Sequence, residues 1–538
     1  MTLTRLFSRC ATVVATMLLA SRSTAQTPES VTVPGLGTLS FPVTTSSGEA
    51  RQAFLRGALL LHLFHYPAAR AAFRQAEQLD SGFTMAWWGE AMAWNYGVWN
   101  QQFPDSARAA LARLGPYPAP RVAKARTPRE RDYLATVETL YGPGTKPHRD
   151  TVYAAAAAQL SETYPDDDEA RLFYALALLG LNQGVRDIPT YGRALALATD
   201  VFRRHPDNPG ASHYVIHASD DPAHAALGLD AARALAKSSP AADHAQHMTS
   251  HIFMALGMWD DLVTANERAT HVDTMAGMSG MKGSGCGHYN YWLDYGYVAQ
   301  GRIALATALL ERCKATARSP SGAVDMWSHY LIDTEDWSGP ESKWTAQFSD
   351  PDDRATYHFA RGLAAARRGD TSAAVVASRS LQQDRADAIA QTHRAHDTQP
   401  ATVQALRRLE VLDLELQALI QSDAGKHDVA IGLLHRATGV EDGMAYAFGP
   451  PEIDKPSHEL LGEELLLAGQ PAAAGIEFQK ALTTTPLRPL ALRGLARADD
   501  AAKLPAGGKS TWRQLAGVWH GADASLPGLD EARRKGAN

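Results

Sequence analysis

The chain has 538 residues and a formal net charge of −6, with 52 Lys and Arg residues against 58 Asp and Glu. This length exceeds what one hydrophobic core usually serves, so several domains or a repeat array are expected, and alanine-rich helical segments favour the array. No cluster of Lys and Arg lies along one predicted face, so nucleic acid is not expected as a partner. Beyond the N-terminus no segment supplies about 20 uninterrupted apolar residues, so the chain is not expected to span a membrane.

The first 25 residues have the three-part form of a secretory signal. Arg5 and Arg9 precede an apolar run at residues 11–20, and small residues then lead up to Ala25. This arrangement predicts cleavage after Ala25 and a periplasmic or secreted protein.

Helical repeats are expected to begin after an extended N-terminal segment at residues 26–48. From Glu49 to Asp80 the sequence predicts two amphipathic helices that meet near Pro67. More degenerate copies of the same helix pair follow at 129–165 and 169–206, so the N-terminal repeats are placed at residues 49–206.

The central region, residues 207–319, is rich in histidine. His213 and His217 are four residues apart, as are His247 and His251, and each member of the first pair precedes its counterpart by 34 residues. Two histidines four apart lie on one helical face. A spacing of about 34 residues is one period of a helix-pair repeat, so the two pairs should lie at equivalent positions of adjacent repeats and face each other across a single seam. The repeats concerned are predicted at 209–240 and 243–273, and a third follows at 287–319.

Imidazoles that converge from rigid helices are suitable ligands for transition metals. The candidate ligands are His213, His217, His244, His247, His251 and His288. The residues that could add ligands or orient the imidazoles are His224, Asp220, Asp221 and Asp243. Such a set suits zinc, copper or iron, and nothing indicates a nucleotide or an organic cofactor. The alternative is that duplication of one repeat copied a packing pair of histidines without any metal.

Two tyrosines and a cysteine share this region. Tyr291 and Tyr295 follow the helical phase of the histidines in the next repeat, and they are candidate catalytic residues beside copper or iron. The alternative is that both pack in the groove. Cys286 has three alternatives: a metal ligand, a disulfide with Cys313, or a free thiol.

An insertion rich in Trp and acidic residues, at 320–353, separates the central repeats from C-terminal repeats at 354–503. Copies of the repeat are predicted at 354–384, 400–440 and 455–486. The proline pair within Tyr446–Lys455 predicts an extended segment there. Residues 504–538 are expected to form a C-terminal tail.

The last of these copies is the clearest. Its characteristic residues are Leu461, Gly462, Leu465, Ala474, Phe478, Ala481 and Pro486. The small residues let two helices approach, Phe478 fills the space against the next pair, and Pro486 ends the second helix. These residues resemble the tetratricopeptide repeat, with His458 in place of its usual Trp. The resemblance implies an all-α fold, a tetratricopeptide-repeat α-solenoid whose antiparallel helix pairs form a right-handed superhelix with a concave groove.

Longer stretches extend the resemblance. Ala86–Met92, His213–His217, His247–Phe253 and Gly449–Glu463 are similar to a set of exported bacterial tetratricopeptide proteins. This resemblance covers most of the chain and implies the fold, but it carries no established activity.

Three hypotheses for the function follow. The first is an exported solenoid that binds a peptide, protein or small ligand in its concave groove and holds a transition metal among the histidines. The second is a metal-free scaffold for protein interaction. The third is a copper- or iron-dependent oxidoreductase built on the same scaffold. A metalloprotease is not expected, because the sequence has no H-E-x-x-H motif.

Overall fold

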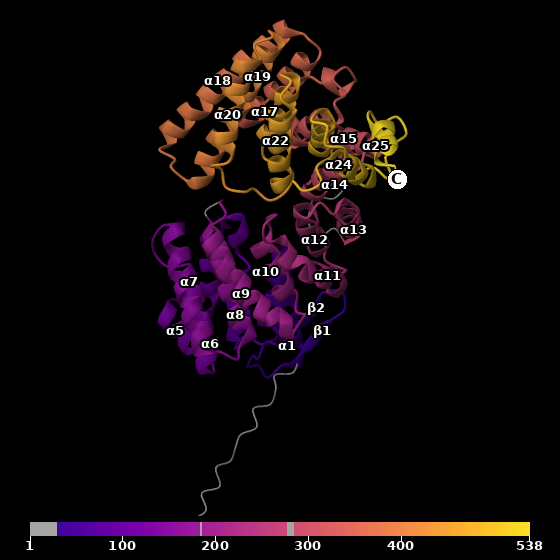
Figure 1. The fold of residues 1–538 in the computed structure, drawn as a ribbon. Helices are drawn as coiled ribbons and strands as arrows, with labels where there is room; N and C mark the ends of the chain where they lie inside the picture. Colours follow the sequence, from indigo (N-terminus) through magenta and orange to yellow (C-terminus); the bar gives the residue numbers. More distant parts are fainter. Residues whose placement is uncertain (1–29, 183–184, 277–284, 538) are drawn as a thin grey trace, which may run out of the picture.

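The computed structural model describes residues 30–182, 185–276 and 285–537, so the expected signal sequence lies outside the described residues. Within this part, the protein is an all-α solenoid in which successive helices pack as pairs, which confirms the predicted fold class (Figure 1). In Figure 1 residues 30–276 form the lower half, with the N-terminal repeats and the first two central pairs, and residues 285–537 form the upper half, with the third central pair and the C-terminal repeats.

The N-terminal repeats end with α9. Their helices are α1 (Gly48–His62), α2 (Tyr66–Leu79), α3 (Thr84–Met92), α4 (Pro104–Leu114), α5 (Pro118–Ala123), α6 (Pro128–Leu140), α7 (Lys146–Thr163), α8 (Asp168–Leu179) and α9 (Ile188–Arg204). The pairs α1 with α2, α6 with α7, and α8 with α9 coincide with the three predicted copies.

Short two-stranded ladders and 3-10 helices complete the connections: β1 (Val31–Val33), β2 (Gly37–Leu39), β3 (Asn95–Tyr96), β4 (Gln101–Gln102), η1 (Gly97–Trp99), η2 (Gly180–Asn182), η3 (Ala225–Gly228), η4 (Pro320–Gly322) and η5 (Glu341–Lys343).

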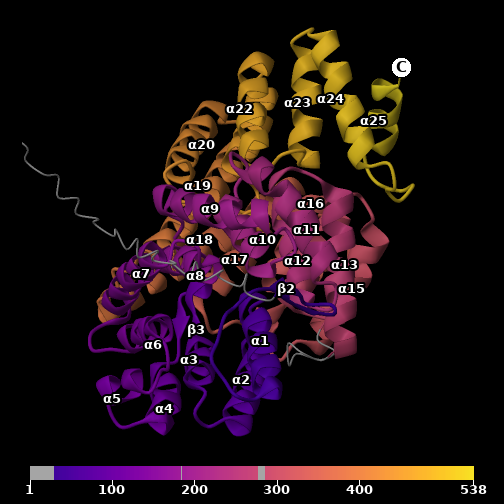
Figure 2. The same cartoon turned by 90° about the horizontal axis from the view of Figure 1, so that it is seen from below.

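The central repeats are three helix pairs. They comprise α10 (Pro209–Ser219), α11 (Leu229–Ser238), α12 (Asp243–Ala255), α13 (Trp259–Ala276), α14 (His288–Ala299) and α15 (Ile303–Thr316). Every residue of α10 and α12 is buried. The reason is visible in Figure 2, where both helices lie in the middle of the molecule, and α10 packs against α1, α8, α9, α11 and α12. Histidines on these helices are therefore largely shielded from bulk solvent.

The C-terminal half is more helical than predicted. Its helices are α16 (Val324–Thr334), α17 (Pro351–Arg367), α18 (Thr371–Ala395), α19 (Pro400–Asp423), α20 (His427–Glu441), α21 (Ser457–Leu467), α22 (Pro471–Thr484), α23 (Pro489–Ala501), α24 (Pro505–Val518) and α25 (Leu529–Gly536). The Trp-rich segment at 320–353 thus includes α16, and its Trp327 indole donates a hydrogen bond to the carbonyl of Glu341 (3.0 Å). Residues 504–538 are not a loose tail, because α24 packs against α23 as a further pair.

The extended N-terminal segment folds back as a hairpin that ties two central loops together. The strands β1 and β2 pair antiparallel. The Thr38 amide donates to the carbonyl of Asp207 before α10, and the Ala241 amide before α12 donates to the carbonyl of Gly35, both at 3.0 Å. These bonds fix the starts of the two helices that carry five of the six candidate ligands.

The segment between α20 and α21 contains no helix or strand, in agreement with its proline pair. It brings Phe448 to 5.7 Å from the ring of His251, measured between ring centroids. Gly449 has a φ of 116°, and a Cβ at this position would lie 3.0 Å from Trp292 of α14. The positive φ and the close approach both require glycine here.

The substitution Gly494→Ala is expected to lower the free energy of unfolding by about 1–3 kcal/mol, because it overpacks a filled site. An added Cβ would lie 2.2 Å from the fully buried ring of Phe478. The matched control is Gly432→Ala on α20, where no atom lies within 4 Å of the new Cβ. This control should stabilise by about 0.5–1 kcal/mol, as alanine does for glycine in a helix. Urea denaturation compares the two, and a shift of the same sign in both would contradict the packing argument.

Candidate metal centre

The histidines of α10, α12 and α14 form two clusters. The inner cluster is His213, His217 and His244, and the outer cluster is His247, His251 and His288. In each cluster the candidate ligand atoms lie within 4.8 Å of one another. All six predicted ligands are therefore brought together, and His217 and His251 face each other as the 34-residue spacing predicted (6.2 Å between ring centroids), but the six divide into two clusters instead of one. His244, in the first turn of α12, groups with the histidines of α10, whereas His247 and His251 lie further along the helix and group with His288 of α14.

The inner cluster has three imidazole nitrogens without partners. The Nδ1 atom of His213 lies 2.6 Å from the carbonyl oxygen of His62. Because a carbonyl only accepts, this Nδ1 carries the proton and the Nε2 lone pair is free. Within residues 30–182, 185–276 and 285–537, the buried Nε2 atoms of His213, His217 and His244 have no hydrogen-bond partner. Such a concentration of unsatisfied buried polar atoms is costly unless something fills the space between them.

Phe64 packs against the whole inner cluster. Its ring centroid lies 4.4 Å from that of His213, 5.5 Å from His217 and 5.7 Å from His244. The residue has a φ of 59°, which is unfavourable for a bulky side chain. Backbone strain of this kind costs about 1–3 kcal/mol and is often found at functional sites.

The tautomers of the outer cluster follow from its hydrogen bonds. The Nδ1 atom of His247 lies 2.7 Å from the side-chain oxygen of Asn266. The Asn266 amide nitrogen donates to the carbonyl of Leu262, so the amide orientation is set and its oxygen must accept. The Nδ1 atom of His251 lies 2.6 Å from a carboxylate oxygen of Asp220. Both Nδ1 atoms therefore carry protons, and both Nε2 atoms present lone pairs.

These two lone pairs face each other. The Nε2 atoms of His247 and His251 are 3.1 Å apart. Two lone pairs at this distance repel, so a cation between them, either a proton or a metal ion, is needed to make the contact favourable. The ring of His288 completes the cluster, with its centroid 4.5 Å from that of His247.

Burial keeps most of these imidazoles neutral. Loss of solvation lowers the pKa of His213 to about 3. The same cause holds the pKa of His217, His244 and His247 well below the ordinary value. Neutral imidazole is the form that coordinates metal ions.

The metal-free protein is accordingly expected to lose stability as the pH falls from about 6.5 to about 4. In this window imidazoles of the unfolded chain bind protons, whereas His213 in the folded chain does not, because its pKa is about 3. The unfolded state takes up more protons, so the free energy of unfolding decreases as the pH falls. Urea midpoints at two pH values, on either side of about 6.5, measure the loss. The variant His213→Gln should show a smaller loss, and an unchanged loss would contradict this explanation.

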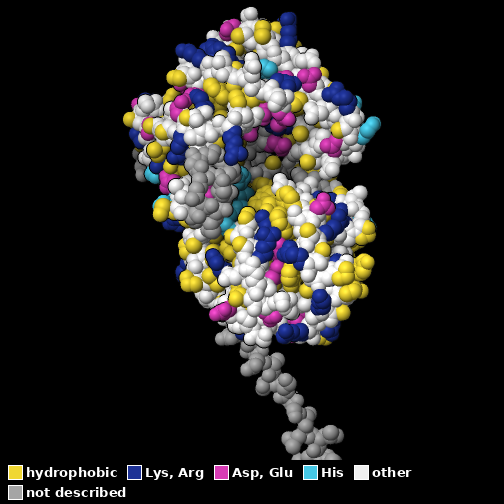
Figure 3. All heavy atoms as spheres, turned by 180° about the vertical axis from the view of Figure 1, so that it is seen from behind, with side chains coloured by type: hydrophobic (Ala, Val, Ile, Leu, Met, Phe, Trp, Pro, Cys, Tyr) yellow, Lys and Arg dark blue, Asp and Glu magenta, His cyan; other side chains and the backbone are white. Residues whose placement is uncertain are grey.

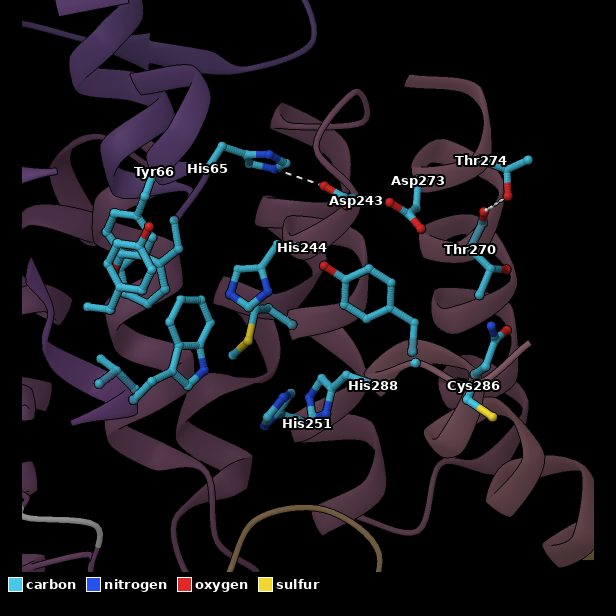
Figure 4. A pocket seen from close by; sticks show the side chains of 18 of the residues that line it. His65, Tyr66, Asp243, His244, His251, Thr270, Asp273, Thr274, Cys286 and His288 are labelled. Atoms are coloured by element: carbon cyan, nitrogen blue, oxygen red, sulfur yellow. Dashed lines mark hydrogen bonds and ion pairs between the residues drawn. The ribbon is translucent and has the colours of Figure 1, made fainter. Parts of the chain in front are cut away.

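A cavity of about 950 Å³ borders both clusters, and Figure 4 shows His244, His251 and His288 facing it. Further side chains that line it include six aromatic and three acidic ones, together with polar residues and one arginine: Phe64, Tyr66, Tyr96, Trp99, Tyr289, Phe448, Asp243, Glu267, Asp273, Gln101, Thr270, Asn290 and Arg312. In Figure 3 histidine side chains are visible at a hollow between the two halves of the molecule. The histidines therefore lie at the wall of a space large enough for an organic molecule.

The predicted orienting residues have different partners. Asp220 holds His251, as described above. Asp221 pairs with His224 (2.8 Å) and with Arg186 (2.8 Å), which places this group beside the clusters without a contact to their ring nitrogens. Asp243 lies 3.0 Å from His65, a pair drawn with a dashed line in Figure 4.

The two candidate tyrosines lie against a different set of residues. Tyr291 and Tyr295 pack on the ring of His329, and the Tyr295 hydroxyl accepts a hydrogen bond from Arg488 (2.9 Å). The tyrosine beside the outer cluster is instead Tyr289, whose ring centroid is 4.7 Å from that of His247. Helical phase alone did not predict which tyrosine lies beside the histidines. The outer cluster lies at the start of α14, whereas Tyr291 and Tyr295 lie further along this helix, toward α16.

Sequence reasoning missed Asn266, although the repeat pattern contained a signal. Leu262, Asn266 and Ala269 have the spacing of Ala474, Phe478 and Ala481 in the clearest repeat. Asn266 therefore replaces the buried Phe of the repeat, and it is fully buried itself. A polar residue at a core position indicates a partner inside the fold, which here is His247.

Of the three alternatives for Cys286, the structure has the disulfide with Cys313. This bond connects the segment before α14 to α15, and so it restrains the chain next to His288. Cys286 is therefore not a metal ligand.

Fold and site together define an all-α helical-repeat protein with two histidine clusters at its centre. No protein-family model matches the chain, and no curated protein matches it. Solved structures with similar folds include human IFIT1 dimer with PPP-AAAA, at 14% identity over 89% of this chain and 95% of that chain with a TM-score of 0.34. The APC/C hetero-tetramer Cut9-Hcn1 matches at 11% identity over 91% of this chain and 76% of that chain (TM-score 0.32). The P58(IPK) TPR domain matches at 12% identity over 85% and 99%, with a TM-score of 0.20. Similarities at this level carry no argument about a ligand.

Across residues 30–182, 185–276 and 285–537, no helix combines the length and apolar character that crossing a membrane requires.

Proposed function

We propose that this protein binds transition-metal ions at its two histidine clusters, one ion at each, and that zinc, copper or iron is the metal. The observation that carries the proposal is the pair of Nε2 lone pairs of His247 and His251, 3.1 Å apart, with both tautomers determined by acceptors on the opposite nitrogens. A metal ion removes the repulsion and uses both lone pairs at once.

The distances suit imidazole coordination. Metal–nitrogen bonds of about 2.0–2.1 Å place two nitrogens of a tetrahedral site about 3.3 Å apart. The two Nε2 atoms of the outer cluster are 3.1 Å apart, close to this value. All ligand atoms of a cluster lie within 4.8 Å of one another, so small side-chain rotations bring the more distant ones to the ion. The hydrogen bonds from Nδ1 to Asn266 and Asp220 have the role of second-layer contacts that orient metal-bound histidines.

Elemental analysis of protein purified without an affinity tag tests the proposal. Dialysed protein is expected to retain about two transition-metal ions per chain. A folded chain that retains no metal, and that takes up neither zinc, copper nor iron in a calorimetric titration, would overturn the proposal. A proton would then occupy the position between His247 and His251.

We infer further that the protein works in the periplasm or outside the cell. The Cys286–Cys313 disulfide supports an oxidising compartment, because such bonds rarely persist in the cytosol. Mass spectrometry of the protein from its native source would test this, since an intact N-terminus and reduced cysteines would both count against export.

A further inference from the structure

The two clusters differ in their access to the cavity. All three Nε2 atoms of the inner cluster are buried from solvent, even though His217 and His244 border the cavity, and the ring of Phe64 lies against each member. In the outer cluster, by contrast, His288 is exposed and lines the cavity together with His251. An exogenous molecule can therefore reach the outer cluster at His288, whereas Phe64 covers the imidazoles of the inner cluster.

Three imidazoles leave a metal ion with at least one coordination position unfilled, as in catalytic zinc sites. At the inner cluster the buried surroundings leave no room for a large molecule at that position. At the outer cluster the position is open to a space of about 950 Å³, within the usual range for pockets that hold organic ligands.

The walls of this space indicate the chemistry of the molecule. Phe448 is 39% exposed and packs 5.7 Å from His251, and Tyr289 packs beside His247 on the other side. Trp99, at 41% exposed, also lines the cavity. Large aromatic side chains with free surface in a cavity favour a flat apolar or aromatic ligand.

The polar groups of the cavity add a second requirement. Among the described residues, no hydrogen-bond partner contacts the buried Oδ1 atom of Asp273, which Figure 4 shows beside Asp243 in the lining of the cavity. A carboxylate accepts hydrogen bonds, so it suits a hydroxyl or N–H group on the ligand. Open positions on an imidazole-bound transition metal take oxygen or nitrogen donors.

We propose that the outer ion keeps its open positions toward the cavity and there binds the oxygen-donor chelating group of a molecule with an aromatic body, while the inner ion is closed to outside ligands. This inference rests on the proposed metal binding. The aromatic body lies against Phe448 and Tyr289, and its hydroxyl or N–H groups face Asp273.

Hydroxamates are suitable probes because acetohydroxamate and benzohydroxamate carry the same chelating group and differ in the aromatic ring. Protein loaded with cobalt(II) is titrated with each, with calorimetry for affinity and the visible spectrum of cobalt for coordination. We expect about one equivalent of benzohydroxamate per chain, bound at least about tenfold more tightly than acetohydroxamate. Metal-free protein should bind neither tightly.

The variant Phe448→Ala should weaken benzohydroxamate and leave acetohydroxamate unchanged. Its matched control is Tyr117→Ala, an aromatic residue that is 69% exposed and outside the cavity. The control should bind both probes as the parent does. Both replaced side chains are on the surface, so folding should survive.

Three results would overturn the inference while leaving metal binding intact. The first is that two equivalents of benzohydroxamate bind per chain. The second is that the two probes bind with equal affinity. The third is that a chain loaded with about two cobalt ions binds no probe, or gives up its cobalt to the probe. A chain that takes up no cobalt, zinc, copper or iron would instead overturn the metal proposal itself.

Discussion

Replacing His247 and His251 together by alanine is expected to reduce the metal content of the purified chain from about two ions to about one. The variant removes both lone pairs that face each other at 3.1 Å, and His288 alone cannot hold an ion against dialysis. Helical content should stay close to that of the parent, because alanine is a good helix former. Elemental analysis and far-ultraviolet circular dichroism on the same samples give the two readouts.

The inner cluster supplies the complementary variant. His213→Ala with His217→Ala should also remove about one ion, and the two double variants combined should leave a metal-free chain. The control is the double variant of His393 and His435, two exposed histidines outside both clusters, which should retain both ions. If the cluster variants unfold and the remaining folded protein keeps its full metal content, the histidines serve packing and not coordination.

The substitution Arg488→Met is expected to have the largest effect on stability, a loss of about 3–5 kcal/mol. The guanidinium is 1% exposed; it donates to Glu459 (2.8 Å) and to the Tyr295 hydroxyl (2.9 Å), and it also pairs with Asp333. Removal of this cation leaves Asp333 buried without its cationic partner and leaves Glu459 with Lys455 alone (2.7 Å). The bonds join α14, α16, α21 and α23, so the loss should loosen the contact between the central and C-terminal repeats.

An exposed arginine provides the comparison. Arg497 pairs with Glu531 at 2.7 Å, but its side chain is 47% exposed. Solvent screening limits such pairs to about 0–1 kcal/mol, so Arg497→Met should barely move the thermal midpoint. Differential scanning calorimetry of both variants tests the contrast. Equal midpoints would show that the buried network around Arg488 contributes no more than a surface pair.

Repeat periodicity was sufficient to predict the helix pairs. Each pair depends on a few residues that act locally, such as the small Gly462, the buried Phe478 and the terminal Pro486. Their spacing alone therefore predicts where helices begin, cross and end. The same reasoning failed for α16 and α24, because these helices depart from the repeat pattern and are stabilised by packing against their neighbours.

The sequence by itself determined that six histidines would gather near the centre, because helical phase and a 34-residue spacing are properties of the chain. Only the tertiary structure decided how they divide into two clusters, which nitrogens carry protons and which cluster opens to the cavity. These properties depend on Phe64, Asn266 and Phe448, which reach the histidines from other helices and loops. Contacts between segments far apart along the chain are set by packing in three dimensions, and no local pattern records them.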